Sequence, residues 1–293
     1  KPLFSRSVSK FKIGQKISQG DVVFYSKKNE RIKFCSPVNG VVKEIIRGAK
    51  RKIIEIIIES IGDNERSSKK AIDYKNLSSE QVKNLLLDSG CWPFIKQRPY
   101  DIIANPSDSP KSIFISTFNS APISADFQII LDDQKEEFKH GVKILSKLFS
   151  GDLNIGIEKN NKSFLNDIDN VKINTFNGPH PAGNVGVQIH HIDPINSGEK
   201  VWTLGAEDVA NIGRYFMTGS YNPVRTLAVS GPPVKYPKYY KTVAGSELCE
   251  IIKDAGINQN DNLRFINGDV LTGYKVESDN YLGFYNNTLS VLR

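Results

Sequence analysis

The segment whose residue types could most readily do chemistry is a glycine- and proline-rich loop at residues 178–186, GPHPAGNVG. A glycine-rich loop after a strand can bring backbone N–H groups close to an anionic or flat ligand. This loop does not match the GxGxxG dinucleotide pattern, its two prolines lack N–H donors, and we expect no clear helix after it. A rigid, closely packed loop is therefore the favoured interpretation. A ligand site is the alternative, with these candidate residues: Gly178, Pro179, His180, Pro181, Gly183 and His190.

Three of the four histidines lie in or just after this loop, His180, His190 and His191, while His140 stands apart. In a strand, the adjacent His190 and His191 would point to opposite faces and could not both bind one metal ion. Asp193 is the only acidic residue at a spacing that resembles a metalloenzyme motif. Packing or hydrogen-bonding roles are therefore favoured over a metal or proton-transfer role, and no metal site is predicted.

The sequence contains no recognisable nucleophile motif, whether G-x-S-x-G, a suitable S-x-x-K or a Cys–His signature, so no catalytic residue is predicted. The three cysteines, Cys35, Cys91 and Cys249, are far apart and form no CxxC pair. This usage argues against a disulfide framework and fits a reducing compartment. It also argues against an iron–sulfur cluster or zinc site with cysteine ligands.

The composition is that of a globular protein, because 39% of the 293 residues are hydrophobic and 24% are charged. The most apolar stretch, residues 53–61, is short and interrupted by glutamates, so we expect no membrane-spanning segment. The net charge of +7 could suit nucleic acid, an anionic membrane surface or an acidic partner, or could simply be a solvated surface. The basic run at residues 43–52 alternates with glutamate and has no aromatic residue, so nucleic acid is not expected as a partner.

The elements that would position these residues begin with short strands over residues 11–60. Valine- and isoleucine-rich stretches between turn glycines suit a pleated, half-buried surface. The pattern G-x5-G-D followed by SPVNGVV is similar to the barrel-sandwich of lipoyl and biotinyl carrier domains. Those carriers present a modified lysine on a hairpin, here residues 26–31, but the corresponding position holds Glu30. We expect an anchoring module, with a carrier lysine at Lys27 or Lys28 as the less favoured alternative.

Helices and strands alternate in the middle of the chain. Ser78 and Gln81 match a capping box, and Gly90 can end the helix that they open. The strand-like stretches that come after it are SIFIST, FQIIL, LNIGIEK, VKINTF and KVWTL. Helical spacing is expected over residues 133–149 and 206–218. This β/α alternation predicts a mostly parallel sheet.

The last part of the chain combines a strand, RTLAVSG, with a proline-rich loop, a helix over residues 246–254 and a hairpin, LRFINGDVLTGYKV. Tyr236, Tyr239 and Tyr240 of the proline-rich loop are candidates for partner contacts. The expected fold class is a multidomain α/β protein with four parts. These are a lipoyl/biotinyl-like β barrel-sandwich at residues 1–62, a linker and helix at 63–99, a Rossmann-like α/β domain at 100–222 and a small β-grasp (SLBB-like) α+β domain at 223–293.

Several longer stretches together carry a family resemblance. They are WPFIKQRPYD, ANPSDSPKSIFIST, FNGPHPAGNVGVQIHHIDP, KVWTLGAEDVANIGRYFMTG and RTLAVSGPPVKYPKYYKTVAGSEL, with PVNGVVKEIIRGAKRKIIEIIIES near the beginning. In combination they resemble the A subunit of the bacterial Na+-translocating NADH:quinone oxidoreductase (Na+-NQR). The layout is also similar to the C subunit of the Rnf complex and to the NADH-binding flavoprotein of respiratory complex I.

The resemblance implies a peripheral subunit on the cytoplasmic face of the bacterial inner membrane, in a respiratory complex that couples NADH oxidation and quinone reduction to Na+ export. It implies other Na+-NQR subunits as partners, chiefly a membrane subunit, with quinone as a further candidate. The chain lacks the cysteine cluster and flavin loop of its relatives, so no redox cofactor is expected in it. FMN, riboflavin and iron centres are expected in partner subunits. The alternative is a quinone- or nucleotide-binding subunit with its own site near GPHPAG. We also expect a fragment that lacks the family's C-terminal region.

Overall fold

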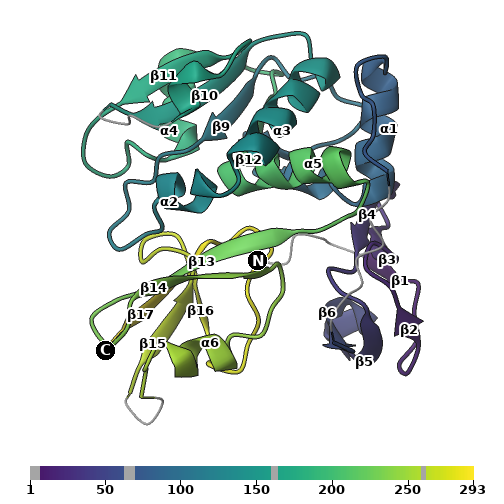
Figure 1. Cartoon of the computed structure of the whole chain (residues 1–293), viewed down its shortest axis with the longest axis vertical. Helices are drawn as coiled ribbons and strands as arrows, with labels where there is room; N and C mark the ends of the chain where they lie inside the picture. The colour runs from purple at the N-terminus through teal and green to yellow at the C-terminus, as the bar shows by residue number, and fades with distance from the viewer. Residues whose placement is uncertain (1–6, 63–69, 160–163, 259–261) are drawn as a thin grey trace.

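The structure is a computed structural model that describes residues 7–62, 70–159, 164–258 and 262–293. It has a barrel-sandwich, a central α/β domain and a β-grasp-like domain, and the last two lie one above the other in Figure 1. The fold class expected from the sequence is confirmed. Among the described residues, no helix has the length and apolar character needed to cross a bilayer.

The barrel-sandwich consists of two three-stranded antiparallel sheets, in the orders β1-β3-β4 and β2-β5-β6. Gly14 and Gly20 have φ values of +83° and +88°, which is the left-handed region that favours glycine at a turn. The strands are β1 (Ser7–Ser9), β2 (Lys16–Ile17), β3 (Val22–Ser26), β4 (Asn29–Cys35), β5 (Gly40–Arg47) and β6 (Ile53–Ser60). Ile17, Val23, Val42 and Ile53 are buried within the barrel-sandwich. Ile32, Phe34 and Cys35 of β4 instead belong to the apolar core of the α/β domain.

Helix α1 (Ser79–Ser89) joins the barrel to the α/β domain and confirms the helix signals of the sequence. The hydroxyl of Ser78 accepts a hydrogen bond from the N–H of Gln81, and the Gln81 side chain accepts one from the N–H of Ser78. Gly90 ends the helix with a φ of +80°. A 3-10 turn, η2 (Trp92–Phe94), then leads into the sheet.

The α/β domain has a six-stranded sheet in the order β11-β10-β9-β12-β7-β8. The first four strands are parallel, as the β/α alternation predicted, and the last two are antiparallel. The strands are β7 (Lys96–Arg98), β8 (Ile102–Ile103), β9 (Ile113–Ser116), β10 (Leu153–Glu158), β11 (Lys172–Phe176) and β12 (Val201–Gly205).

Helices α1, α3 (Lys135–Leu148) and α5 (Ala206–Thr218) pack on one face of this sheet, and the shorter α4 (Val185–Ile192) packs on the other. Helices α3 and α5 cross at two glycines. A Cβ on Gly213 would lie 1.8 Å from the carbonyl oxygen of Glu137, and one on Gly141 would lie 2.0 Å from that of Val209. The two helices can therefore pack this closely only because these positions lack side chains.

One predicted strand of this domain is wrong. The apolar run FQIIL lies in helix α2 (Phe127–Asp132). The carboxylate of Asp126 accepts a hydrogen bond from the N–H of Gln128 and caps the helix, while Ile130 and Leu131 are fully buried. A short apolar run fits a strand and a helix equally well by its pattern alone, and here the cap and the packing decide for the helix.

The β-grasp-like domain has a five-stranded sheet in the order β14-β13-β17-β15-β16, with α6 (Cys249–Asp254) packed on it. The strands are β13 (Val224–Ser230), β14 (Lys238–Val243), β15 (Arg264–Asn267), β16 (Tyr274–Val276) and β17 (Thr288–Leu292). The predicted hairpin is present as β15 and β16. Tyr239 and Tyr240 lie in strand β14 and hydrogen-bond within the chain, so they are not loop residues. Tyr236 is half exposed in the loop.

Candidate functional site

The carboxyl edge of the parallel strands is where ligands bind in many open α/β sheets. From β9 the chain continues to β10 and β11 on one side, whereas β12 lies on the other side of β9. The strand order therefore reverses at β9. The loops after β9 and β11 contain residues 117–126 and 177–184, and both belong to this edge.

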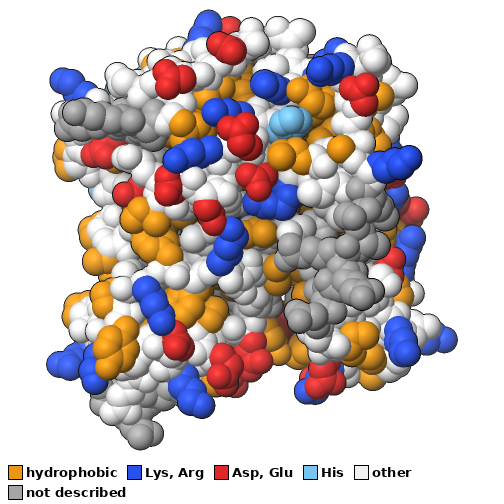
Figure 2. Space-filling model, viewed as in Figure 1, with side chains coloured by type: hydrophobic (Ala, Val, Ile, Leu, Met, Phe, Trp, Pro, Cys, Tyr) orange, Lys and Arg blue, Asp and Glu red, His pale blue; other side chains and the backbone are white. Residues whose placement is uncertain are grey.

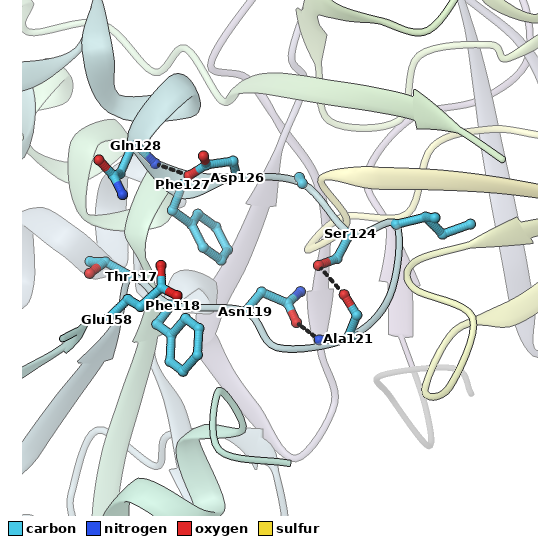
Figure 3. Close-up of a pocket in the computed structure, with 11 residues that line it drawn as sticks. Thr117, Phe118, Asn119, Ala121, Ser124, Asp126, Phe127, Gln128 and Glu158 are labelled. Carbon is cyan, nitrogen blue, oxygen red and sulfur yellow. Dashed lines mark hydrogen bonds between the residues drawn. The ribbon is translucent and has the colours of Figure 1, made fainter. Parts of the chain in front are cut away.

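A hollow of about 260 Å³ lies in the loop after β9. In Figure 3 the loop curves around it, and Glu158 enters from the end of β10. Its lining residues are Thr117, Phe118, Asn119, Ala121, Ile123, Ser124, Ala125, Asp126, Phe127, Gln128 and Glu158. Asn119 accepts a hydrogen bond from the N–H of Ala121, and Ser124 donates one to the carbonyl of Ala121. These bonds hold the loop in shape around a largely polar hollow.

The GPHPAG loop packs against the same β9 loop but does not line the hollow. The N–H of Gly183 donates to the hydroxyl of Ser120 at 2.8 Å, and Nδ1 of His180 lies 3.2 Å from the same hydroxyl. A Cβ on Gly183 would lie 2.4 Å from the backbone nitrogen of Ser120. Close backbone packing therefore explains Gly183 without a ligand. Gly178 and Pro179 are exposed, and the peptide bond between His180 and Pro181 is cis.

The sequence interpretation of the segment after the loop is wrong, because helix α4 begins directly there. His190 and His191 lie in the last turn of this helix, and both are exposed. His180 thus lies in the loop before this helix and His190 in its last turn. Throughout the described part of the chain, no group of three or more His, Cys, Asp or Glu residues could hold a metal ion.

The most completely buried polar cluster joins the α/β domain to the β-grasp-like domain. Glu207, in the first turn of α5, accepts hydrogen bonds from the N–H and the hydroxyl of Thr226 in β13, at 2.9 and 2.8 Å. It also accepts bonds from the side chains of Gln134 and Asn287, at 2.9 and 2.6 Å. The carboxylate is 1% exposed. A buried charge with this many partners is stable only while each partner stays in place.

Arg225 of β13 supplies the positive charge of this cluster. Its guanidinium is 2.5 Å from the carboxylate of Asp208 and 3.8 Å from that of Glu207, and it donates to the carbonyl of Phe284. Desolvation alone would lower the pKa of Arg225, but the two carboxylates raise it, so the group remains cationic. The guanidinium also lies 5.6 Å from the ring centroid of Phe94. Charge and aromatic contacts together fix this side chain in a dry site.

The barrel reaches the same place through an aromatic side chain. The ring centroid of Phe34 in β4 is 6.0 Å from that of Phe284, which in turn is 5.3 Å from that of Phe94. All three domains therefore meet at one point. We call this set the junction cluster: Phe34, Phe94, Glu207, Asp208, Arg225 and Phe284. Sequence reasoning missed it, although a lone arginine in the apolar strand VRTLAVS was a usable signal, since a buried arginine requires an acidic partner.

Two of the cysteines, Cys35 and Cys91, are buried thiols. Burial raises the pKa of both Cys35 and Cys91 to about 12, so neither is a thiolate near neutral pH. At the N-terminus of α5, where a phosphate often binds, the carboxylates of Glu207 and Asp208 already occupy the first turn.

Each of the three domains matches a family of known proteins. Residues 6–61 match the model of the NqrA N-terminal barrel-sandwich hybrid domain, residues 77–221 that of the NqrA second alpha/beta domain, and residues 226–278 that of the NQRA C-terminal domain. In fold, the chain is similar to a chain of an NAD+-reducing nickel–iron hydrogenase in the air-oxidized state, with a TM-score of 0.52 at 11% identity. That match covers 75% of this chain and 48% of the other.

Curated relatives match over nearly the whole chain. The A subunit of the Na+-translocating NADH-quinone reductase of Photorhabdus laumondii is 36% identical over 285 residues, which is 96% of this chain and 63% of that protein. The corresponding subunits of Actinobacillus succinogenes and Pseudomonas aeruginosa are each 35% identical, over 98% and 96% of this chain and 64% and 63% of their own lengths. The chain thus spans less than two thirds of the length of these relatives. With all three of its domains matched, the chain belongs to the NqrA family, the A subunits of Na+-translocating NADH-quinone reductases.

Proposed function

We propose that this chain serves as a peripheral structural subunit of a Na+-translocating NADH:quinone reductase. In this role it holds a fixed surface against a membrane subunit on the cytoplasmic face and takes no direct part in electron transfer. The observation that carries the proposal is the junction cluster, where a buried Arg225 and two carboxylates join the domains. Buried charges of this kind favour one relative arrangement of the parts they connect. A scaffold needs such an arrangement, whereas a mobile carrier does not.

We further propose that the redox groups, FMN, riboflavin and iron centres, are held by partner subunits. Two observations support this part of the proposal. Glu207 and Asp208 occupy the N-terminus of α5 with negative charge, which opposes a cofactor phosphate there. Cys35 and Cys91 have raised pKa values and are buried, so they are poor ligands for iron.

The test is affinity purification of the tagged full-length protein from its own membranes in mild detergent. We expect the membrane subunits to copurify and the eluate to oxidise NADH with a quinone. The protein purified alone should show no flavin absorbance and no stoichiometric iron. A protein that never associates with membrane subunits, or that alone retains a flavin, would contradict the proposal.

A ligand site of this chain's own is the second candidate function, and the hollow after β9 favours it. The hollow lies at the carboxyl edge of the sheet, and Phe118 and Phe127 offer flat apolar surfaces beside polar groups. Titration with a water-soluble quinone, NADH and FMN would test it, using the Phe118→Ala variant as a comparison. Saturable binding that Phe118→Ala weakens would support this function. Absence of binding at millimolar concentrations would remove it.

A further inference from the structure

The positive charge of the chain is concentrated in one domain. Residues 1–62 contain 14 of the 39 Lys and Arg residues but only five of the 32 Asp and Glu residues. The barrel-sandwich segment therefore has a net charge of +9, while the other 231 residues together have a net charge of −2. The whole excess of positive charge in the protein thus belongs to its smallest sheet domain.

Among the described residues, most lysines of the barrel have no acidic partner, whereas most lysines of the α/β domain do. Seven lysines of the barrel take part in none of the ion pairs that the structure describes: Lys10, Lys12, Lys16, Lys27, Lys28, Lys50 and Lys52. In the α/β domain, seven lysines each pair with a carboxylate: Lys83, Lys96, Lys111, Lys135, Lys139, Lys172 and Lys200. Figure 2 shows acidic and basic side chains interleaved over this upper part of the molecule. Within the described residues, the barrel therefore has a positive field that its own acidic groups leave uncompensated.

Two turns of the β2-β5-β6 sheet combine this charge with exposed apolar side chains. Ile13 is 63% exposed between Lys12 and Lys16, in the turn before β2. Ile54 is 58% exposed just after the tip of the β5–β6 hairpin, whose residues include Lys50 and Lys52. Isoleucines at such positions add apolar contact to the attraction that the lysines supply.

Strand β4 of the other sheet attaches the barrel to α1, while Glu55 of β6 lies within electrostatic reach of Tyr274 and Tyr281 in the β-grasp-like domain. The attachment runs through β4, where Arg31 donates to Asn84 and Lys33 pairs with Asp88 of α1. Figure 1 shows β4 beside α1, with β5 and β6 at the far end of the barrel. Lys12, Lys16 and Lys50 are themselves exposed, so the basic turns of the second sheet remain available to a partner.

We propose that the basic turns of the β2-β5-β6 sheet bind anionic phospholipid headgroups, with Ile13 and Ile54 entering the interfacial layer. The proposal rests on the proposed function as a peripheral component of a membrane complex. Ten of the 14 cations in residues 1–62 are lysines, which act as point charges and not as the bidentate forks that arginines present to a specific partner. Lysines without acidic partners, beside exposed isoleucines, fit a fluid anionic surface better than a shaped protein or nucleic-acid partner.

Vesicle co-sedimentation of the full chain tests this. We expect binding to phosphatidylcholine vesicles that contain about 30% phosphatidylglycerol, little binding to pure phosphatidylcholine, and weakening with salt. Changing Lys12, Lys16, Lys50 and Lys52 to Gln should weaken binding about fivefold per lysine, and so several hundredfold in all. The matched control changes Lys135, Lys139, Lys172 and Lys200 to Gln, which removes the same net charge from the α/β domain. Its binding should fall much less, and circular dichroism would verify that both variants fold.

Equal losses in the two quadruple variants would overturn the proposal, because total charge and not the barrel surface would then control binding. So would equal binding to neutral and anionic vesicles. Saturable binding to polyglutamate without binding to vesicles would assign the surface to an acidic protein instead. Copurification with membrane subunits is measured separately in detergent. If copurification persists while vesicle binding is absent, only this inference fails, and loss of copurification alone contradicts only the proposed function.

Discussion

The two interfaces that hold the three domains together are built on opposite principles. The β-grasp-like domain joins the α/β domain through fully buried charges, with Arg225 and Glu207 each 1% exposed. The barrel joins it through Phe34 and Cys35, which pack into the apolar core of the α/β domain, and through an ion pair at the surface between Lys33 and Asp88. The interface with the β-grasp-like domain depends on every charged partner being in place. The interface with the barrel depends mainly on apolar packing, because its ion pair is exposed to solvent.

The contrast between these interfaces predicts which domains of the chain separate most easily. Separating the β-grasp-like domain would break the ion pairs of Arg225 with Asp208 and Glu207. It would also break the bonds from Thr226 and Asn287 to Glu207. Separating the barrel would cost apolar area and one solvent-screened ion pair, that of Lys33 with Asp88. We therefore expect the α/β and β-grasp-like domains to unfold together and the barrel to detach more easily.

The largest effect is expected for Arg225→Met. Without the guanidinium, the carboxylates of Glu207 and Asp208 remain buried with no counter-charge, so the free energy of unfolding should fall by about 3–5 kcal/mol. Urea unfolding followed by circular dichroism would measure it. Adding Asp208→Asn should recover part of the loss, because one of the two buried charges is then gone. A loss below about 1 kcal/mol would mean that this interface behaves like a surface ion pair.

Thiol labelling compares the two interfaces directly. Because burial raises the pKa of Cys35 and Cys91 to about 12, three units above the usual 9.0, we expect their alkylation near pH 8 to be about a thousandfold slower than that of a free thiol. Cys249 is less buried and should react first. In moderate urea, Cys35 should become reactive before the main unfolding transition, as read by mass spectrometry. Fast labelling of Cys35 in the native protein would show that the barrel is not docked.

Gly90→Ala should have an intermediate effect on the attachment of the barrel. A Cβ there would meet Sγ of Cys35 at 2.6 Å, and the φ of +80° already strains an alanine. Clash and strain together should lower the free energy of unfolding by about 2–4 kcal/mol. The matched control is Gly14→Ala, with a φ of +83° and open space around it, which should cost only about 1–2 kcal/mol. Equal shifts of the melting temperature in both variants would show that the contact with Cys35 adds nothing.

Lys33→Ala should have the smallest effect. The lysine pairs with Asp88 at 2.6 Å, but the Asp88 side chain is 69% exposed, so water and salt screen the pair. We expect a loss of about 0.2–1 kcal/mol that shrinks at high salt. Thermal unfolding at low and high ionic strength measures it. A loss as large as that of Arg225→Met would erase the contrast between the interfaces.

Local signals in the sequence identified much of the fold. The capping box at Ser78 and the stop at Gly90 are both present, because a cap depends on residues within one turn. The apolar face predicted for residues 133–149 is buried, including Phe138 and Leu145. The secondary-structure predictions for two short segments were wrong, because contacts with distant residues decide their conformation. FQIIL is a helix because packing and the Asp126 cap outweigh the pattern of a few residues. The segment with His190 and His191 is a helix that buries Gln188 and Ile189.

The sequence by itself determined the mixed α/β fold class, the parallel sheet and the absence of a nucleophile motif, since these come from periodicity, turn residues and residue types. Only the tertiary structure decided that the GPHPAG loop packs through Gly183 while His190 lies at the far end of α4. It alone also brought Arg225 of one domain to Glu207 and Asp208 of another. The physical reason is that burial and ion pairing depend on which distant segments exclude water from each other, and no local pattern records that.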